Sequence, residues 1–322
     1  MNILITGGAG FIGSNLTAAL LQDGRLGNQP ISKIVIADNL SLGRKEFIQQ
    51  FIDGGKVEFY EQDLLDIGGL KKIFQKHKFD AVFHLAANSD IGYGTKFTDW
   101  DLKQGTLATY NVLEAMRRTG CKKIVFASSS AIYGEAVVKP TPEDCGPLLP
   151  ISFYGASKLA CEGLITAFCH NFGFKTWLFR FGNIVGKNGT HGAMVDFINK
   201  LKVNPSRLQV LGNGKQAKPY LYVQDCVEGM IYGFNNASEQ VNYFNLACRG
   251  ASSVKHIARI IIGKMGLKQT AVRYTGGERG WKGDVPQVRL DPRKLSCLGW
   301  TASYTSDQAV QKAAGDLITQ LL

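Results

Sequence analysis

The sequence predicts an α/β protein built on a doubly wound parallel sheet, followed by a smaller and less regular α/β region. Two observations predict this fold class: apolar, β-branched runs recur along the first 182 residues, and helix-like stretches separate them. Strands that are apolar throughout and alternate with helices belong to parallel sheets covered on both faces. The chain has 322 residues, 45% of them hydrophobic, so it can bury such a core as one large domain or two modest ones.

The expected elements follow one another in regular alternation. Strands are expected at residues 2–6, 33–38, 57–63, 81–87, 123–130 and 176–182. Helices are expected at residues 13–22, 67–77, 101–119 and 153–172, where apolar residues recur at helical spacing. Beyond Gly182 the strands are shorter and turns are more frequent, so a region of different character is expected there.

Composition excludes several classes of protein. The formal net charge is +11, but the basic residues are dispersed and form no long run of the kind that marks nucleic-acid binding. The seven cysteines form no CxxC pair, so we expect reduced, buried thiols and no metal site. The apolar runs are much shorter than the ~20 residues of a membrane span, and no targeting segment is visible. We therefore expect a cytoplasmic protein without nucleic-acid or membrane partners.

A glycine-rich loop follows the first expected strand and opens the first expected helix. Its form is GxxGxxG, with Gly7, Gly10 and Gly13. Such glycines permit a tight turn, let the backbone approach a pyrophosphate, and leave helix N-terminal N–H groups free for an anion. Asp38 ends the second strand, where a Rossmann-type fold places an acid on the adenosine ribose. A structural βαβ turn with a capping aspartate is the alternative.

The choice between two dinucleotides follows from the same aspartate. A carboxylate accepts hydrogen bonds from both ribose hydroxyls and repels a 2′-phosphate, so Asp38 favours NAD over NADP. Arg44 and Lys45 lie nearby in the sequence and weaken that preference.

Tyr154 and Lys158 are four residues apart and therefore share one face of the helix expected at 153–172. A phenol has an ordinary pKa of about 10, which a neighbouring ammonium and a nicotinamide cation lower. The pair can therefore take a proton from a sugar hydroxyl. Three serines, Ser128 to Ser130, end the preceding strand and can bring a hydroxyl beside the phenol. An exposed helix face is the alternative.

These motifs, in this order, resemble the extended short-chain dehydrogenase/reductases, and among them the NAD-dependent nucleotide-sugar epimerase/dehydratase family, closest to UDP-glucose 4-epimerase-like members. The resemblance spans nearly the whole chain and rests on GGAGFIG, ADNLS, QDLLD, FHLAA, SSSAIYG, YGASK, RFGNIVG, VLGNGKQ, YLYVQD and KLSCLGW. It implies an NAD-binding Rossmann domain at 1–182, to which 224–250 returns. The substrate-binding region is then 183–223 together with 251–322.

The resemblance also implies the cofactor contacts, residue by residue. Gly7, Gly10, Phe11, Ile12 and Gly13 are expected to bind the pyrophosphate, and Asp38 and Asn39 the ribose. The adenine is expected to contact Asp63 and Leu64, and the inner part of the groove is lined by Leu85, Ala86 and Ala87. The implied cofactor set is completed by Ser41, Ser128, Tyr154, Lys158 and Phe181, with Lys158 on the nicotinamide ribose. Capping of the next helix is the alternative role of Asp63.

The same alignment separates two reactions. Ser129 stands where the family has its catalytic serine or threonine, which shares the sugar's 4-hydroxyl with Tyr154. Sugar 4,6-dehydratases carry an Asp-Glu pair directly after that residue, whereas this chain has Ser130 and Ala131, which cannot serve as acid and base. The resemblance therefore implies a 4-epimerase. Tyr154 takes the C4 hydroxyl proton as a hydride passes to NAD, the 4-keto sugar turns, and the hydride returns to its other face.

Other functions remain open. A reductase that draws hydride from NAD(P)H, or a dehydratase, would act on a nucleotide sugar, and the reductase would share every catalytic residue. A non-catalytic NAD-sensing scaffold is a remote alternative, because such proteins typically lose the tyrosine or the lysine. A UDP-hexose is the substrate most frequent in the family. The resemblance further implies a homodimer, formed through the helices expected at 101–119 and 153–172.

Substrate contacts are implied for Asn88, Ser129, Ser130, Asn183, Ala193, Met194, Lys218, Tyr220, Arg279 and Asp284. The chain departs from the family pattern at four places in this part of the resemblance. The first is the sugar loop, NSDIGYG at residues 88–94, where 4-epimerases vary and where Asn88, Ser89 and Asp90 are expected to face the sugar. Lys218 and Pro219 replace an Arg-Asp pair, and Trp281 replaces an arginine and is expected either to stack on the base or to pack. Leu102-Lys103-Gln104 replaces a segment in which many relatives carry an asparagine, so the loss of a buried polar group is expected there.

Overall fold

The structure is a computed structural model, and it describes residues 1–280 and 284–322. The chain forms two compact units. Unit 1 consists of Met1–Gly134, Pro147–Arg180 and Val227–Phe244, and unit 2 of Glu135–Gly146, Phe181–Cys226 and Asn245–Leu322. Residues 227–244 thus cluster with the first unit, and the assignment of cofactor and substrate roles to the two regions stays a prediction.

Unit 1 is built on a seven-stranded sheet in the order β13-β8-β7-β6-β1-β4-β5. Its strands are β1 (Asn2–Thr6), β4 (Lys33–Asp38), β5 (Val57–Glu61), β6 (Ala81–His84), β7 (Lys123–Ser129), β8 (Lys175–Phe181) and β13 (Val241–Leu246). β1 pairs in parallel with both β4 and β6, β4 with β5, and β6 with β7. The order reverses at β1, as in a doubly wound sheet, so the predicted fold class is confirmed.

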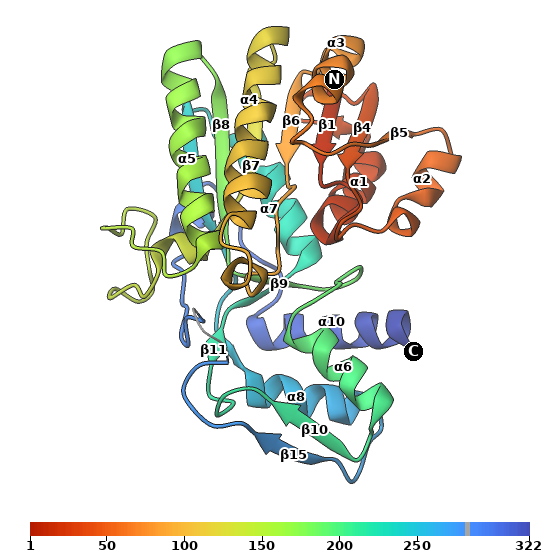
Figure 1. Cartoon of the computed structure of the whole chain (residues 1–322), viewed down its shortest axis with the longest axis vertical. Coiled ribbons are helices and arrows are strands. Elements are labelled where there is room, and N and C mark those ends of the chain that lie inside the picture. Colours follow the sequence, from red (N-terminus) through yellow and green to blue (C-terminus); the bar gives the residue numbers. More distant parts are fainter. Residues whose placement is uncertain (281–283) are drawn as a thin grey trace. The chain divides into compact units, whose positions relative to one another are not determined.

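Helices cover both faces of this sheet. They are α1 (Phe11–Asp23), α2 (Gln49–Asp53), α3 (Ile67–His77), α4 (Ala108–Thr119), α5 (Phe153–Phe172) and α7 (Val223–Asn236). α3, α4 and α5 stand side by side (Figure 1) and share one apolar core with alternate strand residues such as Leu4 and Val82. On the opposite face, Phe234 of α7 packs on Phe83 and Trp177, with ring centroids 6.0 and 4.4 Å apart.

The expected boundaries hold to within a few residues, with one informative exception. The helix predicted at 101–119 begins with a π-helical segment, Leu102–Leu107, before it becomes α4. Gly105 in this segment lies so close to α5 that a Cβ there would be 2.1 Å from the Ser157 hydroxyl. The apolar periodicity of the sequence cannot reveal a change of helical pitch that follows from such a close approach.

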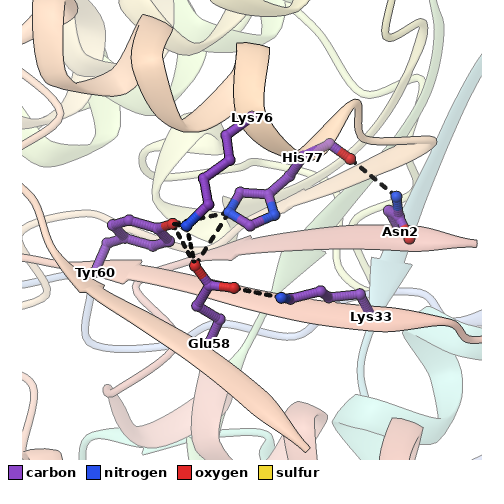
Figure 2. Close-up of polar contacts among 6 residues, drawn as sticks. All are labelled: Asn2, Lys33, Glu58, Tyr60, Lys76 and His77. Carbon is purple, nitrogen blue, oxygen red and sulfur yellow. Dashed lines mark hydrogen bonds and ion pairs between the residues drawn. The ribbon is translucent and has the colours of Figure 1, made fainter.

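A polar network ties the edge strand of the sheet to α3 (Figure 2). Glu58 of β5 pairs with Lys33 of β4 and with Lys76 of α3, whose ammonium lies 2.7 Å from the carboxylate. Tyr60 donates its hydroxyl to Glu58 and lies 2.9 Å from Nε2 of His77. Charged side chains on an edge strand also oppose pairing with another chain.

Unit 2 is smaller and less regular, as expected. Its strands are short: β9 (Asn183–Val185), β10 (Arg207–Val210), β11 (Ala217–Lys218), β12 (Tyr220–Tyr222), β14 (Ser252–Ser253) and β15 (Ala271–Tyr274). They pair in twos, β9 with β12, β10 with β15, and β11 with β14. The helices α6 (Ala193–Val203), α8 (Val254–Lys264) and α10 (Ser306–Leu321) pack on one another, and α9 (Arg293–Cys297) is a single short turn.

Candidate active site

The glycine loop connects β1 to α1 in the predicted manner. Gly7 has φ +69°, a left-handed conformation that favours glycine, and a Cβ there would lie 2.7 Å from the Ala86 amide nitrogen. A Cβ at Gly13 would lie 2.3 Å from the Gly7 carbonyl oxygen. The first turn of α1 has neither an acidic residue nor a side-chain cap. Its N–H groups therefore suit an anion such as a pyrophosphate.

Asp38 ends β4 beside this loop and is buried. Its carboxylate accepts from the Ala9 and Leu40 amides at 3.0 and 2.9 Å, which leaves acceptor capacity on both oxygens for ribose hydroxyls. Burial raises the pKa of Asp38, and the two backbone hydrogen bonds oppose that rise. The loop and the acid together fit an adenosine diphosphate.

The residues predicted around adenine lie on the neighbouring strand ends. Asn39 donates to Asp63 at 3.5 Å and accepts from the Ser41 amide at 3.1 Å. Asp63 also accepts from the Leu65 amide at 2.8 Å, while the Leu64 side chain is buried. Asp63 is therefore a loop-stabilising residue whose second oxygen faces Asn39. Its predicted adenine contact stays a prediction.

Tyr154 and Lys158 both lie near the start of α5, one turn apart. The Lys158 ammonium lies 5.7 Å from the centre of the Tyr154 ring and donates to the Ala127 carbonyl at 2.6 Å. Burial raises the pKa of Tyr154 to about 12, and a hydrogen bond with Ser129 opposes that rise. Burial also lowers the pKa of Lys158 to about 8. The structure thus brings a phenol, a serine hydroxyl and an ammonium together.

A buried ion pair lies next to this group, one turn after Lys158 on α5. Glu162 of α5 and Arg180 of β8 lie 2.8 Å apart, with side chains 8% exposed each. Ser128 donates to Glu162 at 2.5 Å, and Arg180 donates to the Tyr133 hydroxyl at 2.8 Å. The hydroxyl of Ser128, predicted to contact the cofactor, is thus turned into this network. Two features of the sequence indicate this pair: Glu162 lies four residues after Lys158, and Arg180 is a lone charge within an apolar strand.

Hydrogen bonds of the Asn88 side chain stabilise the predicted sugar loop. The Asn88 amide donates to the Asp90 carbonyl at 3.0 Å and to Asp101 at 3.1 Å, and its oxygen accepts from the Asp90 amide. Asn88 is buried, so its predicted sugar contact competes with these bonds. Leu102, in the segment where many relatives carry an asparagine, is 54% exposed, whereas Asp101 before it is 2% exposed. The expected loss of a buried polar group in this segment stays a prediction.

Within unit 2, the predicted substrate residues form two groups. Asn183 of β9 shares a side-chain hydrogen bond with the buried Tyr220 of β12, and Ala193 and Met194 open α6. In the second group, Lys218 pairs with Asp284 at 2.6 Å, and Arg279 donates to the Asp284 carbonyl at 2.6 Å. Arg279 also pairs with Glu135.

The expectations for Trp281 and for a membrane span remain. Trp281, predicted to stack or to pack, lies outside the described residues. No helix among residues 1–280 and 284–322 is both long and apolar enough to cross a membrane.

A parallel sheet that reverses at a glycine-rich β1–α1 turn, with a Tyr-Lys pair beside a serine-ended strand, defines a dinucleotide-binding protein of the dehydrogenase/reductase class. The family model described as the NAD dependent epimerase/dehydratase family matches residues 3–247. The chain belongs to this family, and its cofactor is NAD. The predictions of family and cofactor are confirmed.

Individual relatives agree with this membership. The chain is 30% identical to the putative UDP-glucose 4-epimerase of Methanocaldococcus jannaschii, over 96% of each chain. It is 32% identical to the putative UDP-arabinose 4-epimerase 2 of Arabidopsis thaliana, over 97% of this chain and 78% of that one. A crystal structure of a UDP-galactose 4-epimerase superposes with a TM-score of 0.87 at 37% identity, covering 100% of both chains.

Proposed function

We propose that this protein is an NAD-dependent 4-epimerase of a nucleotide-diphosphate sugar, with a UDP-hexose as its substrate. The observation that carries the proposal is that Ser129, Tyr154 and Lys158 lie together, where they can move a hydroxyl proton. The next two residues, Ser130 and Ala131, offer no acid-base pair for dehydration. The three relatives described above carry the names of 4-epimerases of UDP-linked sugars, two of them as putative ones.

The residues have distinct roles in this reaction. Tyr154 removes the proton from the C4 hydroxyl, and Ser129 holds that hydroxyl and the phenol in one hydrogen-bonded group. The ammonium of Lys158 lowers the free energy of the phenolate, because opposite charges at short range favour the ionised form. Bound NAD would supply the acceptor and donor for the C4 hydride, and the chain's own residues would hold the sugar and move its proton. As the hydride returns to C4, Tyr154 gives its proton to the C4 oxygen, which becomes the inverted hydroxyl.

Unit 2 supplies the candidate residues for the nucleotide. Lys218 and Arg279 carry the positive charge that a diphosphate needs, and Asp284 offers a carboxylate to a ribose hydroxyl. Since Lys218 and Asp284 pair with each other in the protein alone, we propose that the diphosphate competes with Asp284 for the Lys218 ammonium. A lysine replaces the family's arginine here, and it meets phosphate as a point charge without the bidentate fork.

The proposal is tested with purified protein, NAD and separate UDP-, GDP-, ADP- and CDP-sugars. We expect the C4 epimers of a UDP-hexose to equilibrate without added reductant. Chromatography of the nucleotide sugars measures this. NAD should remain bound through many turnovers, because the hydride returns to the sugar. The proposal would be overturned if the protein equilibrated the C4 epimers of none of these sugars. Consumption of NAD(P)H in step with product would instead support the reductase.

We also propose that the protein works as a homodimer in the cytoplasm. Leu107 and Tyr110, three residues apart along one helix face, are 46% and 44% exposed. Phe172 at the end of α5 is 43% exposed. Exposed apolar side chains that gather on neighbouring helices suit an interface between two copies.

A further inference from the structure

Asp101 is a buried carboxylate to which the mechanism above gives no role. It lies directly before the π-helical segment and is 2% exposed. Its Oδ1 accepts from Asn88 at 3.1 Å, while its Oδ2 is buried and has no hydrogen-bond partner among residues 1–280 and 284–322. A buried carboxylate with an unsatisfied oxygen lowers the stability of the fold. Its presence here is therefore better explained by a role in the site than by a role in folding.

Asp101 touches the two segments that surround the reaction group. Its side chain holds Asn88 at the start of the predicted sugar loop. Its backbone carbonyl accepts from the Ser157 hydroxyl at 2.8 Å, and Ser157 directly precedes Lys158 on α5. The Thr106 hydroxyl, inside the π-helical segment, lies 3.1 Å from the same Ser157 hydroxyl. A π-helical segment of this kind is frequent at functional sites.

Asp101 also interacts electrostatically with both members of the Tyr-Lys pair. It raises the pKa of Lys158 and opposes the larger effect of burial, which lowers it. It adds to the burial that raises the pKa of Tyr154. The other titratable groups that act on this pair are Cys161 and Glu162 of α5 and His84 of β6. Burial lowers the pKa of His84 to about 3, so this histidine is neutral.

We propose that Asp101 is a positioning residue of the epimerase site, which holds the loop at Asn88 against α5 and supplies the negative charge that keeps the Lys158 side chain an ammonium. This inference rests on the proposed function. The carboxylate compensates for the loss of solvent around Lys158, since an opposite charge favours the ionised form of a buried amine. Asp101 acts through Lys158 and Asn88 and does not itself exchange a proton with the sugar.

The test compares Asp101→Asn with the matched control Asp99→Asn, an exposed aspartate in the same segment. The measurement is kcat against pH in the NAD-loaded protein. Removal of the Asp101 charge lowers the pKa of both Tyr154 and Lys158, so the pH profile of kcat should move to lower pH by roughly 0.5 to 1 unit. The control should retain the wild-type profile. A purely structural residue would lower kcat equally at every pH.

A second measurement does not depend on the reaction. Burial raises the pKa of Asp101, so its charge destabilises the folded state at neutral pH. Asp101→Asn should therefore unfold at a temperature equal to or above that of the wild type, although its turnover is altered. A lower melting temperature than that of the control variant would show a structural role and overturn the inference.

The remaining outcomes are also decisive. If the wild type is active and the Asp101→Asn profile coincides with it, the inference fails and the proposed function stands. If the wild type turns over no nucleotide sugar, the proposed function fails, and the unfolding measurement alone decides whether Asp101 is kept for stability. If Asp101→Asn does not fold, Asp101→Ser replaces it, and failure of both variants to fold overturns the inference.

Discussion

Burial acts in opposite directions on the two residues at the centre of the site. It raises the pKa of Tyr154 and lowers that of Lys158, so in both cases it favours the neutral side chain. A neutral phenol is a poor base at neutral pH, whereas a pKa of about 8 still leaves the Lys158 side chain mostly an ammonium there. The serine hydrogen bond to Tyr154 and the carboxylate of Asp101 near Lys158 each oppose the effect of burial.

Tyr154→Phe tests the role of the phenol. Loss of a general acid-base group costs about 10²- to 10⁴-fold in rate, so we expect kcat to fall within that range while the NAD content of the purified protein is unchanged. Steady-state kinetics and cofactor release measure the two quantities. Tyr274→Phe, on an exposed strand of unit 2, is the control. Loss of bound NAD in Tyr154→Phe would show that the tyrosine is structural.

At the scale of elements, the Glu162–Arg180 pair fixes α5 against the sheet. It joins the catalytic helix to β8 and, through Ser128, to the end of β7 that carries Ser129. Burial is the largest single effect on the pKa of Arg180 and lowers it, but the hydrogen bonds and charge of Glu162 together with the Tyr133 hydroxyl raise it by more, so the net pKa is raised. Such a pair is costly to break from one side, because the remaining charge is left buried.

Arg180→Met should lower the free energy of unfolding by about 3–5 kcal/mol, because Glu162 would lose its buried partner. The double variant Glu162→Leu with Arg180→Met should recover much of that loss. Denaturant unfolding measures both. Arg118→Met removes a half-exposed arginine from Glu114, which keeps its pair with Arg117, and should change stability by less than about 1 kcal/mol. Equal losses in the two single variants would contradict the role of burial.

The Glu58 network of Figure 2 makes a pH-dependent contribution at the sheet edge. Hydrogen bonds from Lys33, then Lys76, then Tyr60 hold the pKa of Glu58 well below its ordinary value. A lowered pKa means that the stabilisation is complete above the ordinary carboxyl value and is lost as the pH falls through the folded-state value.

Glu58→Gln should therefore lower the free energy of unfolding at neutral pH by up to about 1 kcal/mol, the range of partly exposed ion pairs. The difference from the wild type should shrink progressively in acid. Unfolding curves at a series of pH values measure it, with Glu61→Gln, exposed on the same strand, as control. A difference that is constant across pH would contradict the charge-based account.

The sequence predicts these elements to different degrees. Apolar periodicity and the glycine loop predict β1, α1 and β4 closely, because burial and turn geometry are local properties. The π-helical segment depends on Gly105 meeting Ser157 of another helix, and the Asp101–Asn88 bond joins residues on either side of a loop. Such contacts form only in the folded chain. The pairing of Lys218 with Asp284, 66 residues apart, was unpredictable for the same reason.

At the scale of the whole molecule, association of two copies is the main prediction. Leu107→Glu combined with Tyr110→Glu should convert a dimer into a monomer, because two charges would be buried in the interface. Sedimentation velocity measures the mass. Val203→Glu, at an 87% exposed apolar residue of unit 2, should leave the dimer intact. A monomeric wild type, or a double variant that stays dimeric, would contradict this interface.

The strand order of unit 1 also has a consequence for synthesis on the ribosome. The sheet grows outward from β1 in both directions, and β13, about sixty residues after β8, completes one edge. Until residue 246 has left the ribosome, β8 presents an unpaired edge with the apolar residues Trp177, Leu178 and Phe179. Exposed apolar edges invite pairing with other chains. The nascent chain is therefore most vulnerable to aggregation while residues 182–246 are being made.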